Sequence, residues 1–538
     1  MKSKHVPVLI VGGGLSGLSS ALFLAKHNID YLLIERHPST AIHPKAGGIT
    51  FRTMELFREL GLEKRIRLAG KALENCRGRI AVQTIAEVKN EELEQIRAAQ
   101  YEKNEKLVRE VEEISPSKQT ACYQITLEEM MLQYAQKLGG NLSFNHELVS
   151  YEQNGNGVIA TIRNRETKEE SMIHCDYVIA ADGAKSNIRE ELGILTEGRG
   201  TIGGYYMNIY FEADLSGFIK GDAFGFTMIL HPEVLGALIP VDNESKWIYH
   251  VAYDPIKGER PEDFTIERCK QIIQTAIGSM DIKPEILSVL PWEASESTAV
   301  KFQDNRIFLV GDSAHIMPPT GGFGSNTGIQ DAHNLAWKLA AVIKGKANPK
   351  LLETYHDERY PVAKLTTDHA SSILFRAAGR EGGDLSNMDS LAVTAGYQYC
   401  SEAIIDECNT PHRMDIVDLN GRPGTRAPHF FGTYEGREVS ILDLFGSNFV
   451  LLTGAEHSAF TKVAHDVSSQ LGAKIKVYQV GLTGDFIDQG NSFKKLYGME
   501  NGGAVLIRPD GFIGWRTENE VLKPNELLQD VMKHLLCN

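Results

Sequence analysis

Residues 306–328 read Arg-Ile-Phe-Leu-Val-Gly-Asp-Ser-Ala-His-Ile-Met-Pro-Pro-Thr-Gly-Gly-Phe-Gly-Ser-Asn-Thr-Gly, and this stretch says most about the fold. Its apolar start predicts a buried strand that ends at Gly311-Asp312. A loop rich in proline and glycine follows, and the next residues repeat apolar side chains at helical spacing (Ile329, Ala332, Leu335 and Leu339). A carboxylate between a strand end and a helix N-terminus is well placed to bind hydroxyl groups of an extended ligand.

The N-terminal segment predicts a strand, a glycine-rich turn, a helix and a second strand. The apolar run Val8–Val11 leads into Gly12-x-Gly14-x-x-Gly17, and a second apolar run, 31–34, ends at Glu35. In such a turn the first glycine permits the tight bend, the second lets a pyrophosphate approach, and the third lets the helix pack on the sheet. The helix N-terminus, with Leu15 and Ser16, would face the phosphates. Glu35 would accept hydrogen bonds from the adenosine ribose.

The two motifs together favour FAD. A glycine-rich turn alone fits NAD, NADP or FAD, and Arg36 beside Glu35 could indicate NADP. A flavin cofactor is long, so it needs a second anchor far from its adenosine, and Asp312 would hold the ribityl hydroxyls. Glycines at 321, 322 and 324 would let the backbone pass close to a flat ring, and the following helix N-terminus would face its N1/C2 edge.

Composition narrows the class of protein. The chain has 538 residues, enough for about three domains, and a net charge of −14 without a long basic block. That charge argues against nucleic acid or an anionic membrane as the main partner. No apolar run is long enough for a membrane span, and the N-terminus is a poor signal peptide. Seven scattered cysteines without a Cys-x-x-Cys indicate a reduced, cytoplasmic protein without a structural metal.

The order of predicted elements indicates an α/β fold with several domains. We expect a discontinuous, Rossmann-like FAD-binding domain of residues 1–75, 121–200 and 291–375. An antiparallel-sheet substrate domain, residues 76–120 and 201–290, would interrupt it, because apolar residues alternate from 205 to 211. A helical connector, 376–424, would precede an α/β domain of 425–538, with strands at 449–452, 475–480 and 504–507 and a helix near 458–470.

The charged insertion at residues 87–118 has two interpretations. Leu107, Val111 and Ile114 share one helical face, which predicts a surface helix. Such a helix could be solvated without a role of its own, or it could be a mobile cover over the active site.

Three motifs together resemble the class A flavoprotein monooxygenases, the p-hydroxybenzoate hydroxylase-like aromatic hydroxylases. They are residues 12–17, 182–186 (Asp-Gly-Ala-Lys-Ser) and 311–315 (Gly-Asp-Ser-Ala-His). Residues 319–338 look most like the branch that acts on aromatic polyketides and other polycyclic natural products, to which rifampicin-type antibiotic monooxygenases are similar. The C-terminal part resembles the thioredoxin-like domain of the phenol hydroxylase branch, but without redox cysteines. For that domain we expect a structural or oligomeric role.

The resemblance extends the set of expected cofactor-binding residues. Lys45 stands where relatives have arginine, while Phe323 and Ser325 depart from the common Gly-Gln-Gly-x-Asn pattern. The full set comprises Gly12, Gly14, Leu15, Ser16, Gly17, Glu35, Arg36, Lys45, Ala46, Arg52, Gln124, Asp182, Gly311, Asp312, Pro319, Gly322, Gly324, Ser325 and Asn326.

The resemblance also implies a reaction. NAD(P)H would reduce FAD, O₂ would add at flavin C4a, and one oxygen would pass to an aromatic small molecule. Only one nucleotide fingerprint is present, so NAD(P)H would bind transiently, and the protein would be a monomer or a homodimer. We assign no catalytic residue and no metal ligand. His315 is interpreted as structural, and packing explains most simply the possible phenol bases of the sheet domain, which are Tyr205, Tyr206, His231, Tyr249 and His250.

Two other functions fit the same motifs. The chain could be a non-hydroxylating FAD-dependent oxidoreductase, or a flavin-dependent binding protein that sequesters an aromatic antibiotic. A flavin disulfide reductase fits less well, because it needs a cysteine pair near the first helix and the first cysteine is Cys76.

Overall fold

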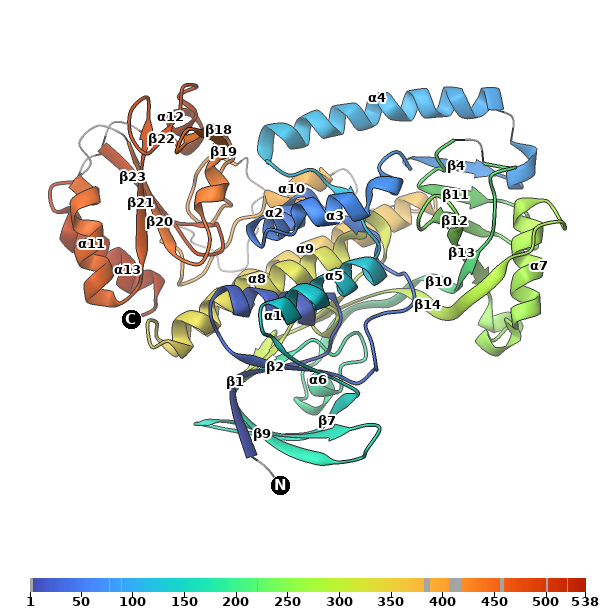
Figure 1. Cartoon of the computed structure of the whole chain (residues 1–538), viewed down its shortest axis with the longest axis horizontal. Coiled ribbons are helices and arrows are strands. Elements are labelled where there is room, and N and C mark those ends of the chain that lie inside the picture. The colour runs from blue at the N-terminus through green and yellow to red at the C-terminus, as the bar shows by residue number, and fades with distance from the viewer. Residues whose placement is uncertain are drawn as a thin grey trace.

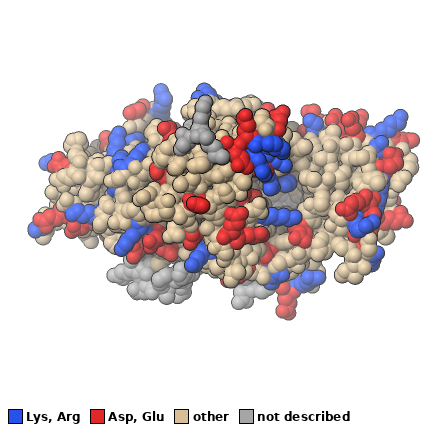
Figure 2. Space-filling view, turned by 90° about the horizontal axis from the view of Figure 1, so that it is seen from below, with Lys and Arg blue, Asp and Glu red and all other residues tan. Residues whose placement is uncertain are grey.

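The computed structural model describes residues 3–76, 78–88, 90–219, 221–381, 388–405, 419–454, 459–499, 502–519 and 521–538. Three large β-sheets lie side by side along its length, with the N-terminal sheet in the middle (Figure 1). On the face shown in Figure 2, the acidic and basic side chains of the described residues are interspersed rather than gathered by sign. No helix in the described ranges has the length and apolar character to cross a membrane.

The central sheet is built on five parallel strands. Strand β1 (Ser3–Val11) lies between β2 (Tyr31–Glu35) and β9 (Glu170–Ala180), β6 (Asn141–Phe144) pairs with β2, and β16 (Ile307–Leu309) pairs with β9. The sheet continues through β15 (Gln303–Asp304) and the hairpin of β7 (His146–Asn154) and β8 (Gly157–Asn164). The late Gly-Asp motif therefore follows a strand of the same sheet as the first motif.

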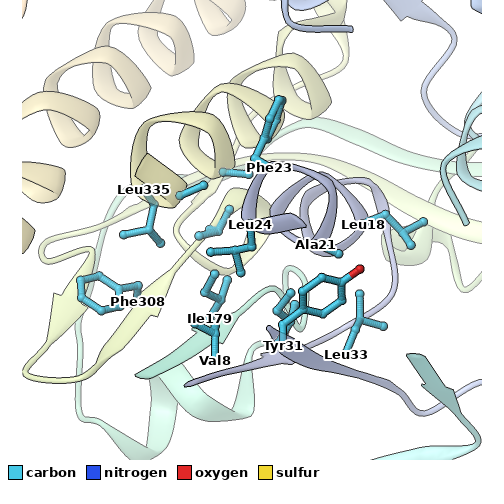
Figure 3. Close-up of a cluster of buried hydrophobic side chains, with 14 of the residues drawn as sticks. Val8, Leu18, Ala21, Phe23, Leu24, Tyr31, Leu33, Ile179, Phe308 and Leu335 are labelled. Carbon is cyan, nitrogen blue, oxygen red and sulfur yellow. The ribbon is translucent and has the colours of Figure 1, made fainter. Parts of the chain in front are cut away.

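Helices pack against this sheet and bury its apolar strands. Figure 3 shows Leu24 of α1 (Leu15–Lys26) beside Val8 and Ile179 of the sheet. Leu18 of the same helix lies toward Leu33, and Leu335 of α8 (Phe323–Ile343) lies toward Phe308. Strands of a parallel sheet that is covered on both faces are apolar along nearly their whole length, as residues 31–34 of β2 and all of β16 are here. The remaining helices of this part are α2 (Phe51–Glu59), α3 (Glu63–Ala69), α5 (Gln124–Lys137), α6 (Asn187–Glu191), α9 (Thr354–Ala377) and α10 (Ser390–Ala395).

The second sheet is antiparallel except at one edge. Its order is β17 (His315–Ile316), β14 (Glu285–Ala299), β10 (Thr196–Glu212), β13 (Lys246–Tyr253), β12 (Gly236–Pro240), β11 (Phe226–Ile229) and β4 (Arg79–Val82), with β4 parallel to β11. Met207, Ile209 and Phe211 join the core under α7 (Ile266–Ile277). Because side chains alternate along a strand, Tyr206 and Asn208 lie on the opposite face.

The charged insertion forms one long helix, α4 (Asn90–Ile114), that reaches from α2 toward the second sheet (Figure 1). Near its end, Val111 is buried against Phe51 and Ala395. Near its start, Arg97 donates to the backbone carbonyl of Asp222 at 2.6 Å and lies over the Phe224 ring. The predicted helix is present, and it is attached to both parts.

The third sheet confirms the predicted C-terminal α/β unit. Parallel strands β20 (Phe449–Gly454) and β21 (Ile475–Gly481) are joined by α11 (Ala459–Leu471), and the antiparallel β23 (Gly502–Ile507) pairs with β20. The sheet is completed by β18 (Phe431–Tyr434), β19 (Arg437–Ser440), β22 (Phe486–Ile487) and β24 (Ile513–Asn519), and the other helices are α12 (Ser492–Tyr497) and α13 (Pro524–Leu535). The predicted connector falls partly outside the described residues.

Candidate cofactor site and substrate face

The first glycine motif is required by backbone contacts. Gly12 has φ +113°, and a Cβ there would lie 2.2 Å from the carbonyl oxygen of Ala181. A Cβ on Gly17 would lie 1.9 Å from the carbonyl oxygen of Gly12. Gly14 differs, because its nearest neighbour would be Glu128 Oε1 at an ordinary 3.6 Å. Gly12 and Gly17 therefore serve the turn itself, whereas Gly14 leaves space beside it.

Glu35 lies beside this turn. Its carboxylate accepts hydrogen bonds from the backbone N–H of Gly13 at 2.6 Å and of His37 at 2.8 Å. The acid that the sequence places at the end of β2 is thus fixed next to the start of α1. Gly14 caps α1 without a side-chain hydrogen bond, so the N–H groups of the first turn stay open to an anion. This open helix end fits the pyrophosphate of FAD.

The two glycine motifs meet in space. A Cβ on Gly311, which has φ +68°, would lie 2.1 Å from the Ser16 hydroxyl oxygen, and a Cβ on Gly328 would lie 2.5 Å from it. The Ser313 hydroxyl donates to the backbone carbonyl of Ala180 at 2.6 Å. The start of α1, the end of β16 and α8 therefore form one surface at the carboxyl ends of the parallel strands, where ligands of such sheets bind.

Asp312 has the environment of a ligand-binding group in a recess. Its side chain is exposed to solvent, yet desolvation by the surrounding protein raises the pKa of its carboxyl. Because the Asp312 side chain is exposed, its carboxylate is accessible to a ligand. Lys45 and His315 partly oppose the shift by charge. The segment around Lys45 therefore lies close to the late motif.

Gln124 and Ala46 join the same region through a residue that the sequence analysis missed. Gln124 Nε2 donates to Glu128 Oε1 at 2.7 Å, and the backbone N–H of Gln124 donates to the carbonyl of Ala46 at 2.7 Å. Burial raises the pKa of the buried Glu128 carboxyl, the nearby Glu35 adds to that rise, and Lys45 opposes it. The Gln-x-x-x-Glu spacing, which puts both side chains on one helical face, could have pointed to Glu128.

The loop before α8 is held by Asn326. This buried side chain accepts from the backbone N–H of Thr50 at 3.0 Å and donates to the carbonyls of Gly48 and Gly322 at 3.0 and 2.7 Å. Gly321 and Gly322 both have positive φ, and the Phe323 ring lies where a Cβ on Gly321 would be. Pro319, Gly324 and Ser325 lie at least partly exposed along this loop.

Two expected cofactor residues, Arg52 and Asp182, have contacts within the protein. The buried Arg52 guanidinium pairs with Glu55 at 2.9 Å and donates to the carbonyl of Asp510 at 3.2 Å. Asp182 accepts from the hydroxyl of Ser186, the N-cap residue of α6, at 2.6 Å, and its backbone lies beside Gly12. The Arg36 side chain is exposed. These contacts turn Arg52 toward the C-terminal domain and lend its cofactor role no support.

The face of the second sheet opposite α7 carries flat and polar side chains. Tyr206 stacks on Trp292 with ring centroids 4.7 Å apart, and Trp292 Nε1 donates to His250 Nδ1 at 2.9 Å. His43, two residues before Lys45, bridges to this sheet, because its Nδ1 lies 2.5 Å from Ser288 Oγ. The face therefore looks toward the cofactor segments and suits an aromatic ligand.

The other possible phenol bases lie elsewhere. Tyr249 is fully buried in the core under α7, and its hydroxyl donates to the carbonyl of Val234. Tyr205 is exposed, and His231 lies in the turn before β12, where its Nδ1 accepts from the backbone N–H of Glu233 at 3.4 Å. Of the five, Tyr206 and His250 lie on the face turned toward the cofactor segments.

Two models of known protein families match this chain, one over its N-terminal two thirds and one over its C-terminal domain. Residues 5–370 match the family model "FAD binding domain", and residues 420–538 match "Aromatic-ring hydroxylase, C-terminal". The chain belongs to the FAD-dependent aromatic-ring hydroxylases. The predicted fold class, FAD and the class of FAD-dependent aromatic monooxygenase are thereby confirmed.

Relatives of this hydroxylase match it over nearly its whole length. Tetracenomycin A2 monooxygenase-dioxygenase of Streptomyces glaucescens is 38% identical over 96% of this chain and 94% of that protein. Aklavinone 12-hydroxylase RdmE of Streptomyces purpurascens is 34% identical over the full length of both. The crystal structure of aklavinone-11 hydroxylase with FAD and aklavinone superposes with a TM-score of 0.88 at 33% identity, covering 100% of each chain.

Behind the turn at Gly311 and Asp312 lies a buried polar network. Asp331 accepts from the backbone N–H of Gly311 at 3.2 Å, lies 2.7 Å from His315 Nε2 and pairs with Arg359 at 2.7 Å. Arg359 also donates to the Tyr399 hydroxyl at 3.0 Å. His315 is buried, and its Nε2 contacts this network through Asp331.

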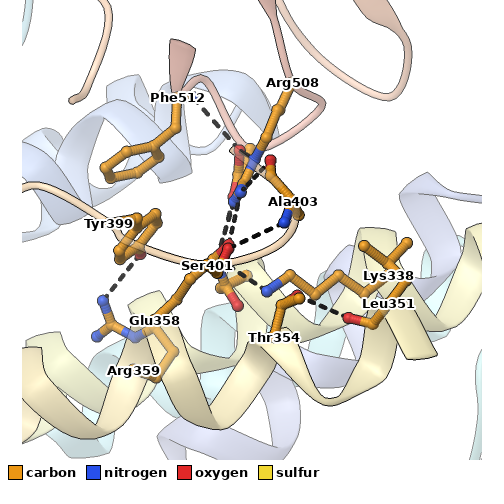
Figure 4. Close-up of polar contacts among 12 residues, drawn as sticks. Lys338, Leu351, Thr354, Glu358, Arg359, Tyr399, Ser401, Ala403, Arg508 and Phe512 are labelled. Carbon is orange, nitrogen blue, oxygen red and sulfur yellow. Dashed lines mark hydrogen bonds and ion pairs between the residues drawn. The ribbon is translucent and has the colours of Figure 1, made fainter. Parts of the chain in front are cut away.

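The neighbouring residue on α9, Glu358, faces the C-terminal domain (Figure 4). It accepts from both terminal nitrogens of Arg508, at 2.6 and 2.8 Å, and from Lys338 at 2.8 Å. Burial alone would raise the pKa of Glu358, but Arg508 and Lys338 hold it well below its usual range. The turn that carries Arg508 is thus anchored in the FAD-binding part of the chain.

Proposed function

We propose that this hydroxylase uses NAD(P)H and O₂ to add one oxygen atom to an electron-rich ring of a polycyclic aromatic polyketide. The observation that carries the proposal is the full-length superposition on a hydroxylase that holds FAD and aklavinone. Relatives named for tetracenomycin and aklavinone, which are similar over nearly the whole chain, support the same substrate class.

Residues of the first motif would hold the adenosine half of the cofactor. Bound FAD supplies the redox chemistry, taking a hydride from NAD(P)H and passing one oxygen of O₂ to the ring. The open N-terminus of α1 would bind the pyrophosphate, and Glu35 would accept from the ribose hydroxyls. Glu35 already bonds to the Gly13 N–H, so it is held in place before the ribose arrives.

Residues of the late motif would hold the flavin half. The accessible Asp312 carboxylate would accept from the ribityl hydroxyls, with Lys45 nearby. The N-terminus of α8, which has no side-chain cap, would favour negative charge on the facing edge of the ring. Asn326 fixes the loop that brings these groups together.

The sheet face would orient the substrate. Trp292 and Tyr206 offer flat surfaces to a polycyclic ring. His250, which is bonded to Trp292 and lies opposite Asn208 on the neighbouring strand, offers a polar group. The proposed reaction balances without a protein nucleophile, since substrate, O₂, NAD(P)H and a proton give hydroxylated product, water and NAD(P)⁺.

Isotope labelling tests this function. The FAD-loaded enzyme is mixed with NADPH, isotopically heavy O₂ and a panel of hydroxyanthraquinones and tetracyclic aglycones that includes aklavinone. We expect a product that gains one labelled oxygen for each NADPH oxidised. NADPH oxidation that returns all labelled oxygen as hydrogen peroxide, for every compound, would instead favour a non-hydroxylating oxidoreductase. Tight binding without NADPH oxidation would favour a sequestering protein.

A further inference from the structure

Trp292 and His250 form a fixed pair on the sheet face that is turned toward the cofactor segments. The indole Nε1–H of Trp292 donates to His250 Nδ1 at 2.9 Å, and the two rings meet edge to face with centroids 5.4 Å apart. Tyr206 stacks on the indole with centroids 4.7 Å apart and holds it in place. The pair is therefore supported on two strands, β13 and β14.

The hydrogen bond decides the tautomer of His250. An indole N–H can only donate, so Nδ1 of the imidazole must accept, and the proton of the neutral ring lies on Nε2. A proton on Nδ1 would point at the indole N–H of Trp292, and two donors cannot form a hydrogen bond with each other. Burial, and then the nearby His43, lowers the pKa of His250 to about 4, so its ring is neutral at neutral pH. Asn208, directly opposite on β10, carries no charge.

The remaining Nε2–H of His250 is free to meet a ligand. Within the described residues, no side chain or backbone group accepts a hydrogen bond from Nε2. This nitrogen is also not among the buried side-chain atoms that lack a partner, so it keeps contact with solvent. The imidazole is half-buried, in contrast to the fully buried Tyr249 on the other face of the same strand.

We propose that His250 donates a hydrogen bond from Nε2 to a phenolate or quinone oxygen of a hydroxyanthraquinone-like substrate, and that Trp292 is the positioning residue that keeps the proton on Nε2. This assignment rests on the proposed function, because it needs an oxygen-bearing aromatic ring on this face. His250 is then a donor and not the base that removes the phenol proton. The proton lost by the phenol does not go to His250, because the one acceptor nitrogen of His250 is occupied by Trp292.

Such a donor has a chemical consequence for the substrate. Hydrogen bonds to a charged acceptor are stronger than those to a neutral one, so the Nε2–H favours the phenolate over the phenol. The pKa of the bound phenol falls, and the phenolate ring is richer in electrons than the phenol ring. The pair would therefore prepare the substrate for oxygen transfer without itself exchanging a proton.

Titration of bound alizarin, whose absorbance changes when a hydroxyl ionises, tests the donor role. The oxidised, FAD-loaded enzyme is titrated as wild type, His250→Phe, which keeps a ring, and His250→Gln, which keeps a donor near Nε2. We expect bound alizarin to ionise about one pH unit higher in His250→Phe, a tenfold change in the equilibrium, and His250→Gln to restore most of the difference. His231→Gln, on an outer turn of the same domain, is the matched control and should behave as wild type.

A double-mutant cycle tests the positioning role of Trp292. Trp292→Phe leaves an aromatic ring in the stack but removes the N–H that fixes the tautomer. We expect it to raise the ionisation pH of bound alizarin in the His250 protein and to have no such effect in the His250→Gln background, where no tautomer needs fixing. An equal effect in both backgrounds would show that Trp292 only packs, and would overturn its assignment.

The donor assignment and the proposed function fail in different ways. Wild type that binds no alizarin, or His250→Phe that ionises alizarin as wild type does while flavin content and thermal unfolding are normal, would overturn the assignment even if labelled product forms. Normal His250 effects on alizarin without labelled product from any substrate would overturn the proposed function alone.

Discussion

At the scale of single residues, accessibility separates groups that bind from groups that hold the structure. Asp312 is exposed although the protein around it raises the pKa of its carboxyl, whereas Asp331 is buried and accepts three protein hydrogen bonds. We therefore expect Asp312→Ala to fold normally and to lose FAD. Flavin absorbance after gel filtration, with circular dichroism as the folding check, measures both. An Asp312→Ala protein that stays as yellow as wild type would contradict the assignment.

The pH dependence of FAD binding follows from the same residue. Because the pKa of Asp312 is raised, its carboxylate takes up a proton at a higher pH than an ordinary aspartate. A protonated carboxyl is a weaker acceptor for ribityl hydroxyls, so FAD affinity should fall as the pH drops through this raised pKa. Asp312→Asn should bind FAD more weakly near neutral pH and lack this acid transition. A wild-type dissociation constant that is unchanged across the acid range would contradict the prediction.

His315 makes its contacts inside the protein. Its Nε2 contacts Asp331, which also holds the Gly311 backbone, so His315→Asn should disturb the turn while Arg359 keeps Asp331 paired. We expect turnover to fall several-fold, with FAD still bound. A complete loss of hydroxylated product, with normal reduction of the flavin by NADPH, would give His315 a chemical role that its burial argues against.

At the scale of elements, glycine patterns could be predicted because their cause is local. The turn after β1 needs Gly12 for its positive φ and Gly17 for its contact with the Gly12 carbonyl, and both causes lie within the turn, so the sequence alone identifies it. The approach of His43 to Ser288 and of Arg52 to Asp510 depends on segments far apart in the chain, and no local pattern encodes it. Arg52 shows the limit, since its motif suggested the cofactor while its contacts lie with the C-terminal domain.

Two substitutions in one turn should separate folding from binding. Alanine at Gly17 would place its Cβ 1.9 Å from a backbone oxygen, so we expect Gly17→Ala to lose stability or fail to fold. Alanine at Gly14 meets its nearest atom at 3.6 Å, and the backbone there has an ordinary negative φ. Gly14→Ala should therefore unfold near the wild-type temperature but bind FAD much more weakly. Equal effects on melting temperature would refute this division.

At the scale of the whole molecule, the C-terminal domain is joined to the FAD-binding part by two kinds of ion pair. Arg58 and Asp443 form a partly exposed, two-point contact at 2.6 and 2.8 Å. Glu358, Lys338 and Arg508 form a fully buried one. Exposed pairs contribute about 0.2–1 kcal/mol, whereas breaking a buried pair costs about 3–5 kcal/mol because a charge is left without its partner.

The two contacts therefore give matched tests of how the domain is held. Asp443→Asn should change the free energy of unfolding little. Glu358→Gln should lower it by about 3–5 kcal/mol, because Lys338 would stay buried without the carboxylate it pairs with and Arg508 would keep only Asp510. Denaturant unfolding measures both, and limited proteolysis shows whether the C-terminal domain is released first. The pKa of Glu358 is lowered, so its stabilising contribution is present above the ordinary carboxylate pKa and is lost only as the pH falls through the lowered value. A Glu358→Gln protein as stable as Asp443→Asn would show that the domain is held chiefly by its apolar contacts.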